Sequence, residues 1–268
     1  MRELYIALCI VLLVPAAVLY LLFQTKYVGV TTHTLPNHKG SFRIVQVSDI
    51  HGATRFLNGR LSRLVNRFKP DIICVTGDLA NHRGQLPRVI GEIAEFRAGH
   101  GVFFVPGNYE REEQTGFWQK GLITGPPTYR DYLNGEMTVL ENEARTVQVG
   151  ETDVFIYGFD NSIYGNEAIT ADLPEDAFVL LLAHSPNIIR FLDKHQIQGD
   201  LLLCGHTHSG QIRLFGRTIG AYKHFHIGVK QVADHAYFAI TRGLGMVKLP
   251  LRLNCRPEIA VYDLVQKP

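Results

Sequence analysis

Five short fragments of this 268-residue chain carry side chains that bind divalent metals. They offer carboxylate, amide and imidazole groups, which together suit ions such as Mn²⁺, Zn²⁺ and Fe. In chain order the fragments are Asp49-Ile50-His51, Gly77-Asp78, Gly107-Asn108, Ala183-His184 and Gly205-His206-Thr207-His208. Two four-coordinate ions need roughly eight protein contacts, and a carboxylate with two oxygens can serve both. The chemistry expected from such a site is the activation of water.

Each fragment taken alone has an ordinary structural explanation. A Gly-Asp or Gly-Asn pair is typical of a turn, and His-x-His also occurs where two strand residues face the same side. Five fragments that each close a strand are hard to explain as unrelated turns. Glycine beside Asp78, Asn108 and His206 also lets the backbone turn sharply and approach a ligand closely.

The strands and helices expected between the fragments place these side chains at one edge of a sheet. Strands are expected over residues 42–47, 71–76 and 102–105, with amphipathic helices near residues 57–68 and 89–96. This β-α-β-α-β order predicts a parallel sheet with right-handed crossovers. Open α/β sheets bind ligands beyond the carboxyl ends of their strands, which is where Asp49, Asp78 and Asn108 fall.

The chain beyond residue 110 has a different pattern. Residues 110–140 are rich in Gly, Pro and aromatic residues, which predicts an insertion over the sheet edge. A helix is expected near residues 188–194. Short strands are expected over residues 139–140, 146–149, 154–158, 178–183, 200–204, 238–241 and 259–263.

Taken together, the five fragments resemble the calcineurin-like metallophosphoesterase superfamily. The resemblance extends from about residue 42 to residue 263. Residues 205–213 (GHTHSGQIR) and 242–259 (RGLGMVKLPLRLNCRPEI) are further similar to its membrane-associated bacterial phosphodiesterase branch. That branch includes a UDP-2,3-diacylglucosamine pyrophosphatase of lipid A synthesis.

The resemblance implies an α/β fold, a four-layer αββα sandwich, and a metal-dependent phosphohydrolase. It implies seven ligands: Asp49, His51 and His208 for one ion, Asn108, His184 and His206 for the other, and Asp78 as the bridge. Mn²⁺ is the favoured cofactor, although oxygen and imidazole ligands also suit Zn²⁺ or Fe. The implied reaction is hydrolysis of a phosphoric anhydride or phosphodiester bond.

One position departs from the family's pattern. In most of the family a His follows the Asn and assists the leaving group, whereas here Tyr109 follows Asn108. A phenol, with a pKa near 10, is a poorer proton donor at neutral pH than an imidazolium. A phosphate leaving group needs no such proton, so we predict a pyrophosphate bond. Two alternatives are that Tyr109 itself donates a hydrogen bond, or that His82, four residues after Asp78, assists.

Aromatic and basic residues give weaker indications of a lipid-linked substrate such as UDP-2,3-diacylglucosamine. Four aromatic residues of the insertion could line an apolar entrance or could simply pack the insertion: Phe117, Trp118, Tyr129 and Tyr132. Three arginines could clamp phosphates, although each alone reads as a surface residue: Arg83, Arg111 and Arg213. The alternative functions are a broad-specificity phosphodiesterase of cell-envelope polymers or nucleotides, and a non-catalytic scaffold with the same fold.

The first 24 residues predict a membrane anchor. Leu4 to Phe23 is an uncharged run of 20 residues, enough to cross ~30 Å of hydrocarbon as a helix. Bulky residues near its end argue against a cleaved signal peptide. Lys26, Lys39 and Arg43 follow the run and favour a catalytic domain on the cytoplasmic side of the inner membrane. Residues 25–41 then form a linker, and residues 42–268 the catalytic domain.

The composition of the chain argues against several other classes of protein. Hydrophobic residues make up 46% and charged residues 19% of the chain, which is typical of a folded protein. A net charge of +2 is too balanced to predict nucleic acid as the main partner. The four cysteines form no CxxC pair, so no cysteine-based zinc site is indicated.

Overall fold

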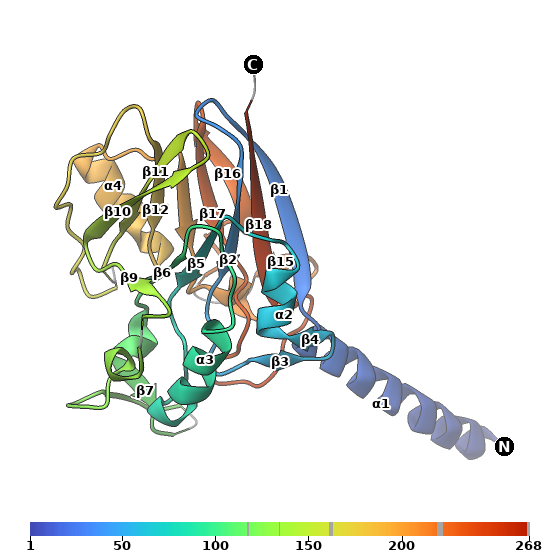
Figure 1. Ribbon diagram of the computed structural model, residues 1–268. Coiled ribbons are helices and arrows are strands. Elements are labelled where there is room, and N and C mark those ends of the chain that lie inside the picture. The colour runs from blue at the N-terminus through green and yellow to red at the C-terminus, as the bar shows by residue number, and fades with distance from the viewer. Residues whose placement is uncertain (117, 134, 161–162, 219–221, 267–268) are drawn as a thin grey trace.

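Two six-stranded mixed sheets are stacked face to face in the body of the molecule (Figure 1). The computed structural model describes residues 1–116, 118–133, 135–160, 163–218 and 222–266, without the side chains of residues 3, 4 and 6–10. The first sheet has the order β1 (Gly29–Asn37), β18 (Glu258–Gln266), β2 (Phe42–Val47), β5 (Ile72–Thr76), β6 (Val102–Val105) and β9 (Thr138–Val139). Its strands β2, β5, β6 and β9 are parallel, whereas β18 runs antiparallel to β2.

The second sheet has a parallel centre and antiparallel edges. Its order is β10 (Glu143–Val149), β11 (Thr152–Gly158), β12 (Phe178–Leu182), β13 (Leu201–Cys204), β17 (Ala236–Ile240) and β16 (Gly228–Ala233). Strands β11, β12, β13 and β17 are parallel, and β10 and β16 pair antiparallel with their neighbours. Parallel centres need crossover connections, which is why the sequence alternates buried strands with helices or long loops.

Short helices and hairpins complete the body. The α-helices are α2 (Leu61–Asn66), α3 (Leu86–Ile93) and α4 (Ile189–His195). The 3₁₀ helices are η1 (Arg83–Gln85), η2 (Asn108–Glu110), η3 (Tyr129–Tyr132), η4 (Pro186–Ile188) and η5 (His208–Gly210). Small hairpins are formed by β3 (Arg55–Phe56) with β4 (Gly59–Arg60), β7 (Glu112–Gln114) with β8 (Lys120–Leu122), and β14 (Arg213–Leu214) with β15 (Arg217–Thr218).

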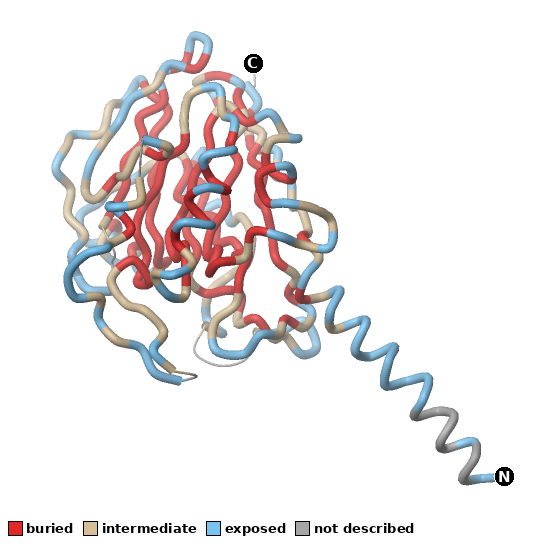
Figure 2. Tube along the Cα trace, turned by 60° about the horizontal axis from the view of Figure 1, so that its bottom comes forward, coloured by how far each residue is buried: buried red, intermediate tan, exposed pale blue. Residues whose placement is uncertain are grey.

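Alternating side chains build three apolar layers from the two sheets. In β2, Ile44 packs between the sheets while Val45 packs beneath α2 and α3. In β12, Leu180 packs between the sheets and Leu181 beneath α4. Successive strand residues point to opposite faces, so strands buried on both faces read as continuous hydrophobic runs. The buried residues follow the strands of both sheets (Figure 2), giving the helix–sheet–sheet–helix order that was expected.

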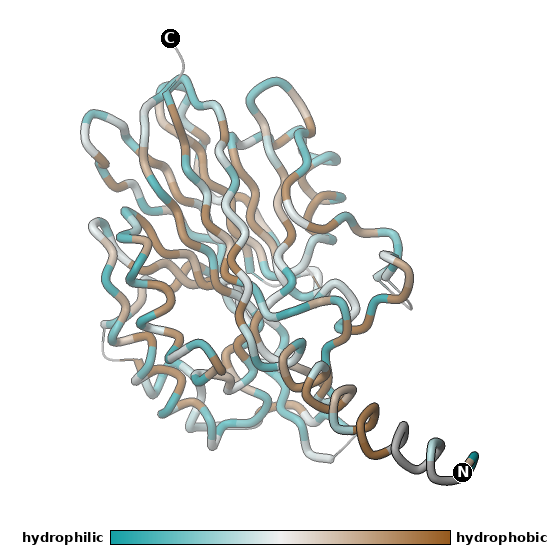
Figure 3. The backbone as a smooth tube through the Cα atoms, turned by 90° about the vertical axis from the view of Figure 1, so that its right-hand side faces the viewer, coloured by the Kyte–Doolittle hydropathy of each residue, from teal (hydrophilic) through white to brown (hydrophobic). Residues whose placement is uncertain are grey.

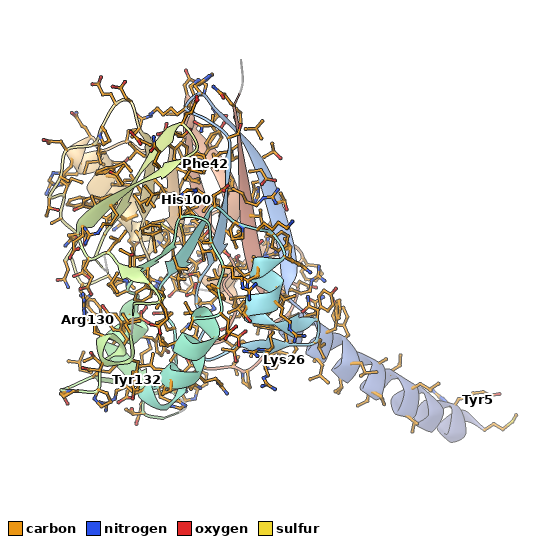
Figure 4. The ribbon with its side chains drawn as sticks, viewed as in Figure 1. Tyr5, Lys26, Phe42, His100, Arg130 and Tyr132 are labelled. Atoms are coloured by element: carbon orange, nitrogen blue, oxygen red, sulfur yellow. The ribbon has the colours of Figure 1, made fainter. Side chains whose placement is uncertain are left out.

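Helix α1 (Arg2–Lys26) leaves the body at the same end as β3, β4 and β7 (Figure 1). Hydrophobic residues occupy several of its turns (Figure 3), and those between Val11 and Phe23 are largely exposed. Lys26 lies where the helix joins the body and Tyr5 near its free end (Figure 4). Among the residues with described side chains, no helix combines the length and apolar character needed to cross a membrane. The transmembrane helix expected from the sequence is therefore not confirmed.

The contact between α1 and the body is specific. Tyr20 Oη donates to Asn254 Oδ1 at 3.0 Å, and the Arg252 amide donates to Thr25 Oγ1 at 3.1 Å. The guanidinium of Arg256 lies 5.4 Å from the centroid of the Phe23 ring. The last turns of α1 are thus attached to the segment before β18.

The predicted linker, residues 25–41, differs from the structure. Most of it forms β1, an edge strand paired parallel with β18 over its whole length. Its sequence, GVTTHTLPN, contains a Gly and a Pro that indicate a loop. An edge strand tolerates both because one side of its backbone needs no partner. Edge strand β16, with four of its six residues exposed, was likewise not expected.

Candidate metal centre

The ends of five parallel strands deliver the predicted ligands to one end of the molecule. Asp49, Asp78 and Asn108 follow β2, β5 and β6 of the first sheet, while His184 and His206 follow β12 and β13 of the second. The site therefore lies where the carboxyl ends of both sheets meet. Phe42, at the start of β2, lies at the far end of the body from Tyr132 of the insertion (Figure 4).

Five of the seven predicted ligands have a left-handed backbone. Their φ angles lie between 45° and 67°: Asp49, His51, Asp78, His206 and His208. Such conformations cost about 1–3 kcal/mol each for residues other than glycine, and they cluster at functional sites. The surrounding structure holds the ligand backbone in place, for example through the Asp49 amide, which donates to Gly77 O at 2.9 Å.

The first ligand group contains Asp49, His51, Asp78 and His208, whose ligand atoms all lie within 4.8 Å of one another. His51 Nε2 lies 3.1 Å from His208 Nε2 and 3.5 Å from Asp78 Oδ2. His208 Nε2 lies 3.2 Å from Asp49 Oδ1. All four side chains are buried, so two imidazole nitrogens and two carboxylates face a common centre away from bulk water.

The second group contains Asp78, His184 and His206. His184 Nε2 lies 3.4 Å from Asp78 Oδ2 and 3.1 Å from His206 Nδ1. Asp78 belongs to both groups, and its Oδ2 lies between His51 and His184. Asp78 is therefore the one residue that the two groups share.

Asn108 lies beside Asp78 and lines the same pocket. Its Oδ1 is buried and has no hydrogen-bond partner in the described part of the chain. A buried acceptor without a partner is costly, and an ion in the pocket would satisfy it. The donor set of oxygen and imidazole nitrogen also fits divalent ions such as Mn²⁺, Zn²⁺ or Fe.

Neighbouring groups orient the ligands. His184 Nδ1 lies 2.8 Å from Thr76 O, so this nitrogen carries the proton and leaves Nε2 free to bind an ion. Ser48 Oγ donates to Asp49 Oδ2 at 2.6 Å. The buried Glu110 accepts from the amides of Asp78 at 2.9 Å and Gly107 at 2.6 Å, which fixes the turns that carry Asp78 and Asn108.

Two glycines leave space that the ligands need. A Cβ at Gly107 would lie 2.3 Å from Asp78 Oδ1, and one at Gly205 would lie 2.5 Å from Asp49 Oδ2. No side-chain carbon is tolerated at such distances. The glycines of the fragments are therefore required by close approach to the two carboxylates.

The electrostatics of the cluster favour cations. Burial opposes ionisation of Asp49 and Asp78, but the neighbouring imidazoles lower the pKa of both carboxyls well below the usual range. Burial lowers the pKa of His51 to about 4 and that of His206 to about 3, which leaves both rings neutral and able to donate a lone pair. Burial also opposes charge on His184, but Asp78 raises its pKa to about 10, so an ion that binds at Nε2 must displace a proton from this nitrogen.

A pocket of about 310 Å³ opens onto this cluster. Tyr109 lines it, with its ring centroid 4.8 Å from that of His51. Burial raises the pKa of the Tyr109 phenol above its ordinary value. His82 is exposed at the start of η1 and does not line the pocket, so the structure does not bring this candidate to the site.

The proposed phosphate-binding arginines are engaged elsewhere. Arg83 pairs with Glu113 at 2.9 Å, Arg111 pairs with Asp160 at 2.7 Å, and Arg213 donates to Gly216 O. None of the three lines the pocket. The structure therefore does not bring these three arginines to the pocket, and each of them lies where a surface residue was the alternative.

The aromatic residues of the insertion divide between two roles. Tyr129 is buried and packs on Phe104 with a centroid distance of 5.5 Å, and Tyr132 is packed against the same core. These two residues hold the insertion in place. Trp118 is exposed near the pocket residue Lys248, and Phe117 lies outside the described residues.

Several other pocket residues were not predicted, among them Lys120, Gln211, Tyr222 and Lys248. Tyr222 Oη lies 3.2 Å from His206 Nε2, so it orients the ring, whose Nδ1 lies 3.1 Å from His184 Nε2. Gln211 stands three residues after His208, within the GHTHSGQIR segment, which is the one signal that could have identified it.

The family model for calcineurin-like phosphoesterases matches residues 42–210, which contain all seven predicted ligands. The chain belongs to the calcineurin-like phosphoesterase family. As a member it is a metal-dependent phosphohydrolase, and its Asp/His site is compatible with two divalent ions.

Several curated members of this phosphoesterase family are similar along most of the chain. The Uncharacterized metallophosphoesterase YkuE of Bacillus subtilis is 30% identical, over 90% of this chain and 87% of its own. An Uncharacterized metallophosphoesterase of Aquifex aeolicus is 29% identical, over 92% and 94%. The Transmembrane protein with metallophosphoesterase domain of Bos taurus is 28% identical over 90% of this chain, which spans 57% of that longer protein.

Proposed function

We propose that the chain hydrolyses a phosphoric anhydride in a lipid-linked substrate such as UDP-2,3-diacylglucosamine, using two divalent ions, with Mn²⁺ favoured. The position of Asp78 between the two ligand groups is the observation that carries the two-ion part. Asp49, His51 and His208 hold one ion, and Asn108, His184 and His206 hold the other. Two ions so placed would polarise the phosphoryl oxygens and bring the pKa of a shared water close to neutral.

The residues of the chain set the charge and shape of the site. Asn108 is a neutral ligand, which limits the negative charge that an anionic substrate meets. His184 is held by Thr76 O and His206 by Tyr222, so both rings keep the orientation that ligation needs. Burial excludes bulk water from the carboxylates and strengthens their interaction with cations.

Tyr109 supports the choice of an anhydride. Its phenol has a raised pKa and is a weak proton donor at neutral pH. An alkoxide leaving group would need a proton, whereas a phosphate leaving group is stable without one. The resemblance places the family's assisting His immediately after Asn108. In this chain Tyr109 occupies that position and lines the pocket.

The reaction can be tested with three substrates and one metal. Purified protein is treated with a chelator, and activity is measured before and after addition of Mn²⁺ on UDP-2,3-diacylglucosamine, an alkyl phosphomonoester and an alkyl phosphodiester. We expect activity to depend on Mn²⁺ and kcat/KM to be highest for the anhydride. Faster hydrolysis of the simple esters would contradict the anhydride proposal and favour the broad-specificity alternative, and activity that survives chelation would contradict the metal proposal.

We also propose that residues 1–24 anchor the chain in the inner membrane as a single pass, with the catalytic domain on the cytoplasmic side. The proposal is supported by the uncharged run from Leu4 to Phe23, by the exposed apolar side chains of α1, and by Lys26 and Arg43 after the run. Extraction of cell membranes at alkaline pH should leave the full chain in the membrane and release a variant lacking residues 1–24. Release of both proteins would contradict an anchor.

A further inference from the structure

One wall of the pocket is formed by the loop that joins β17 to β18. Within it, Val247 and Lys248 line the pocket together with Asp78 and Asn108. Lys248 is exposed to solvent rather than buried in the fold. The loop therefore presents an ammonium group at the mouth of the metal centre.

The backbone on both sides of Lys248 is fixed by Gln211. The amide of Val247 donates to Gln211 Oε1 at 2.6 Å, and Gln211 Nε2 donates to Val247 O at 3.2 Å and Leu249 O at 3.3 Å. Gln211 is itself buried and follows η5, which carries His208. Lys248 also has a left-handed φ of 61°, a conformation that persists only where neighbours impose it. The position of Lys248 is thus tied to that of a metal ligand.

A second ammonium group stands nearby in the same pocket. Lys120 Nζ lies 4.0 Å from the centroid of the Tyr109 ring. It also lies 3.3 Å from a Glu112 oxygen, in a partly exposed pair of the kind that contributes little. Lys248 Nζ lies 5.8 Å from the Trp118 ring centroid, and no carboxylate forms an ion pair with it in the described part of the chain.

We propose that Lys248, assisted by Lys120, forms an anion subsite that binds a second phosphate of the substrate beside the metal centre. The inference rests on the proposed function, because the metal centre takes the phosphoryl group that is attacked. Ammonium groups bind phosphate as mobile point charges, and they suit a group that departs after cleavage. The substrate class is therefore a diphosphate ester rather than a phosphate with one anionic centre.

The subsite can be tested with a matched pair of substrates, butyl diphosphate and butyl phosphate, in excess Mn²⁺. The quantity measured is the ratio of their kcat/KM values in the full-length protein. Loss of a charge-assisted contact should lower this ratio about tenfold in Lys248→Met. Lys248→Arg should keep the ratio within about threefold of wild type because it keeps the charge. Lys230→Met, on the exposed edge strand β16, is the control and should leave the ratio unchanged.

Binding without turnover gives a second readout. Calorimetric titration with the methylene analogue of butyl diphosphate should show about tenfold weaker binding to Lys248→Met. If Tyr109 alone sets the preference for diphosphates, Lys248→Met should change neither the ratio of the kcat/KM values nor the affinity for the analogue. That result would overturn the subsite. Failure of the wild type to hydrolyse either substrate would instead overturn the proposed function.

Discussion

At the scale of single residues, the site depends on backbone conformations that proteins usually avoid. Asp78 has a φ of 58°, and its carboxylate lies against His51 on one side and His184 on the other. Glu110 holds the Asp78 amide, and the Tyr109 amide donates to Asp78 Oδ1 at 2.9 Å. A strained residue with this many fixed contacts is preorganised, so an ion meets ligands that need little rearrangement.

Tyr109 allows the leaving-group argument to be tested. Tyr109→His places an imidazole where most of the family has one, and general acid catalysis typically contributes 10²–10⁴-fold. We expect kcat for an alkyl phosphomonoester to rise by at least about tenfold, which is less than the full effect, because its alkoxide gains a proton donor. Hydrolysis of a diphosphate ester should change by less than about threefold.

Tyr109→Phe is the matched control, since it removes the hydroxyl without adding a proton donor. It should give no gain on the alkyl ester. An equal gain on both substrates for Tyr109→His, or no gain on either, would show that proton donation at this position does not separate esters from anhydrides.

Residue types and order predicted which Asp and His side chains form a cluster, but they did not predict the residues around it. Asp49, Asp78 and Asn108 could be recognised because each directly follows a hydrophobic strand. Lys248 and Tyr222 lie in segments whose hydrophobic residues follow no helical or strand period. Only the folded chain shows that they line the pocket. His82 is exposed at the start of the short η1 turn. Its distance from Asp78 in the sequence could not show whether its side chain faces the pocket or the solvent.

At the scale of elements, helices α2 and α3 are joined by one buried carboxylate. Glu92 of α3 accepts from the Ser62 amide at 2.8 Å and from Arg60 Nη2 at 2.8 Å. Both helices pack on the sheet that carries Asp49 and Asp78. Glu92 therefore helps to stabilise the layer behind the metal centre.

Replacing Glu92 by Gln should destabilise the fold in a pH-dependent manner. Burial opposes ionisation of Glu92, but its bonds with Arg60 and Ser62 lower its pKa from the ordinary 4.5. A lowered folded-state pKa contributes stability above the unfolded-state value, and this contribution is lost as pH falls through the folded-state pKa. In urea unfolding, Glu92→Gln should lose about 1–3 kcal/mol at pH 7.

The loss caused by Glu92→Gln should shrink steadily below pH 4.5. Glu95→Gln, on an exposed residue just beyond α3, is the control and should stay within about 0.5 kcal/mol of wild type. A loss for Glu92→Gln that is constant from pH 7 to pH 4 would contradict the role of its charge.

The sequence predicted buried helices and strands better than elements at the edge of a sheet. The buried strands β2, β5 and β6 and the apolar face of α3 have clear periodicity, and the structure confirms them with shifts of a few residues at their ends. Strand β1 was predicted as a linker because its stability comes from pairing with β18, more than 200 residues later. Pairing across that distance leaves no trace in a local pattern.

At the scale of the whole molecule, the candidate metal centre joins the two sheets. Asp49 and Asp78 come from the first sheet, and His184 and His206 come from the second. Metal binding should therefore stabilise the whole fold. At a concentration 100 times Kd, Mn²⁺ should contribute about 2.7 kcal/mol, which corresponds to a rise in Tm of roughly 5–10 °C for a domain of this size.

A thermal unfolding experiment with and without Mn²⁺ checks this stabilisation. A chelator should reverse the rise in Tm, and His184→Ala should reduce it because the second ion loses a ligand. A Tm that does not respond to Mn²⁺, Zn²⁺ or Fe²⁺ would contradict a metal centre that spans the two sheets.

The most direct measurement of the central claim is the metal content of the purified chain. After reconstitution with Mn²⁺ and removal of free ions, elemental analysis should find two ions per wild-type chain. Asp78→Ala should retain fewer than one ion per chain and lose at least about 10³-fold in kcat, because both ions share this carboxylate. Two ions retained in Asp78→Ala, or none bound by the wild type, would contradict the bridging role of Asp78.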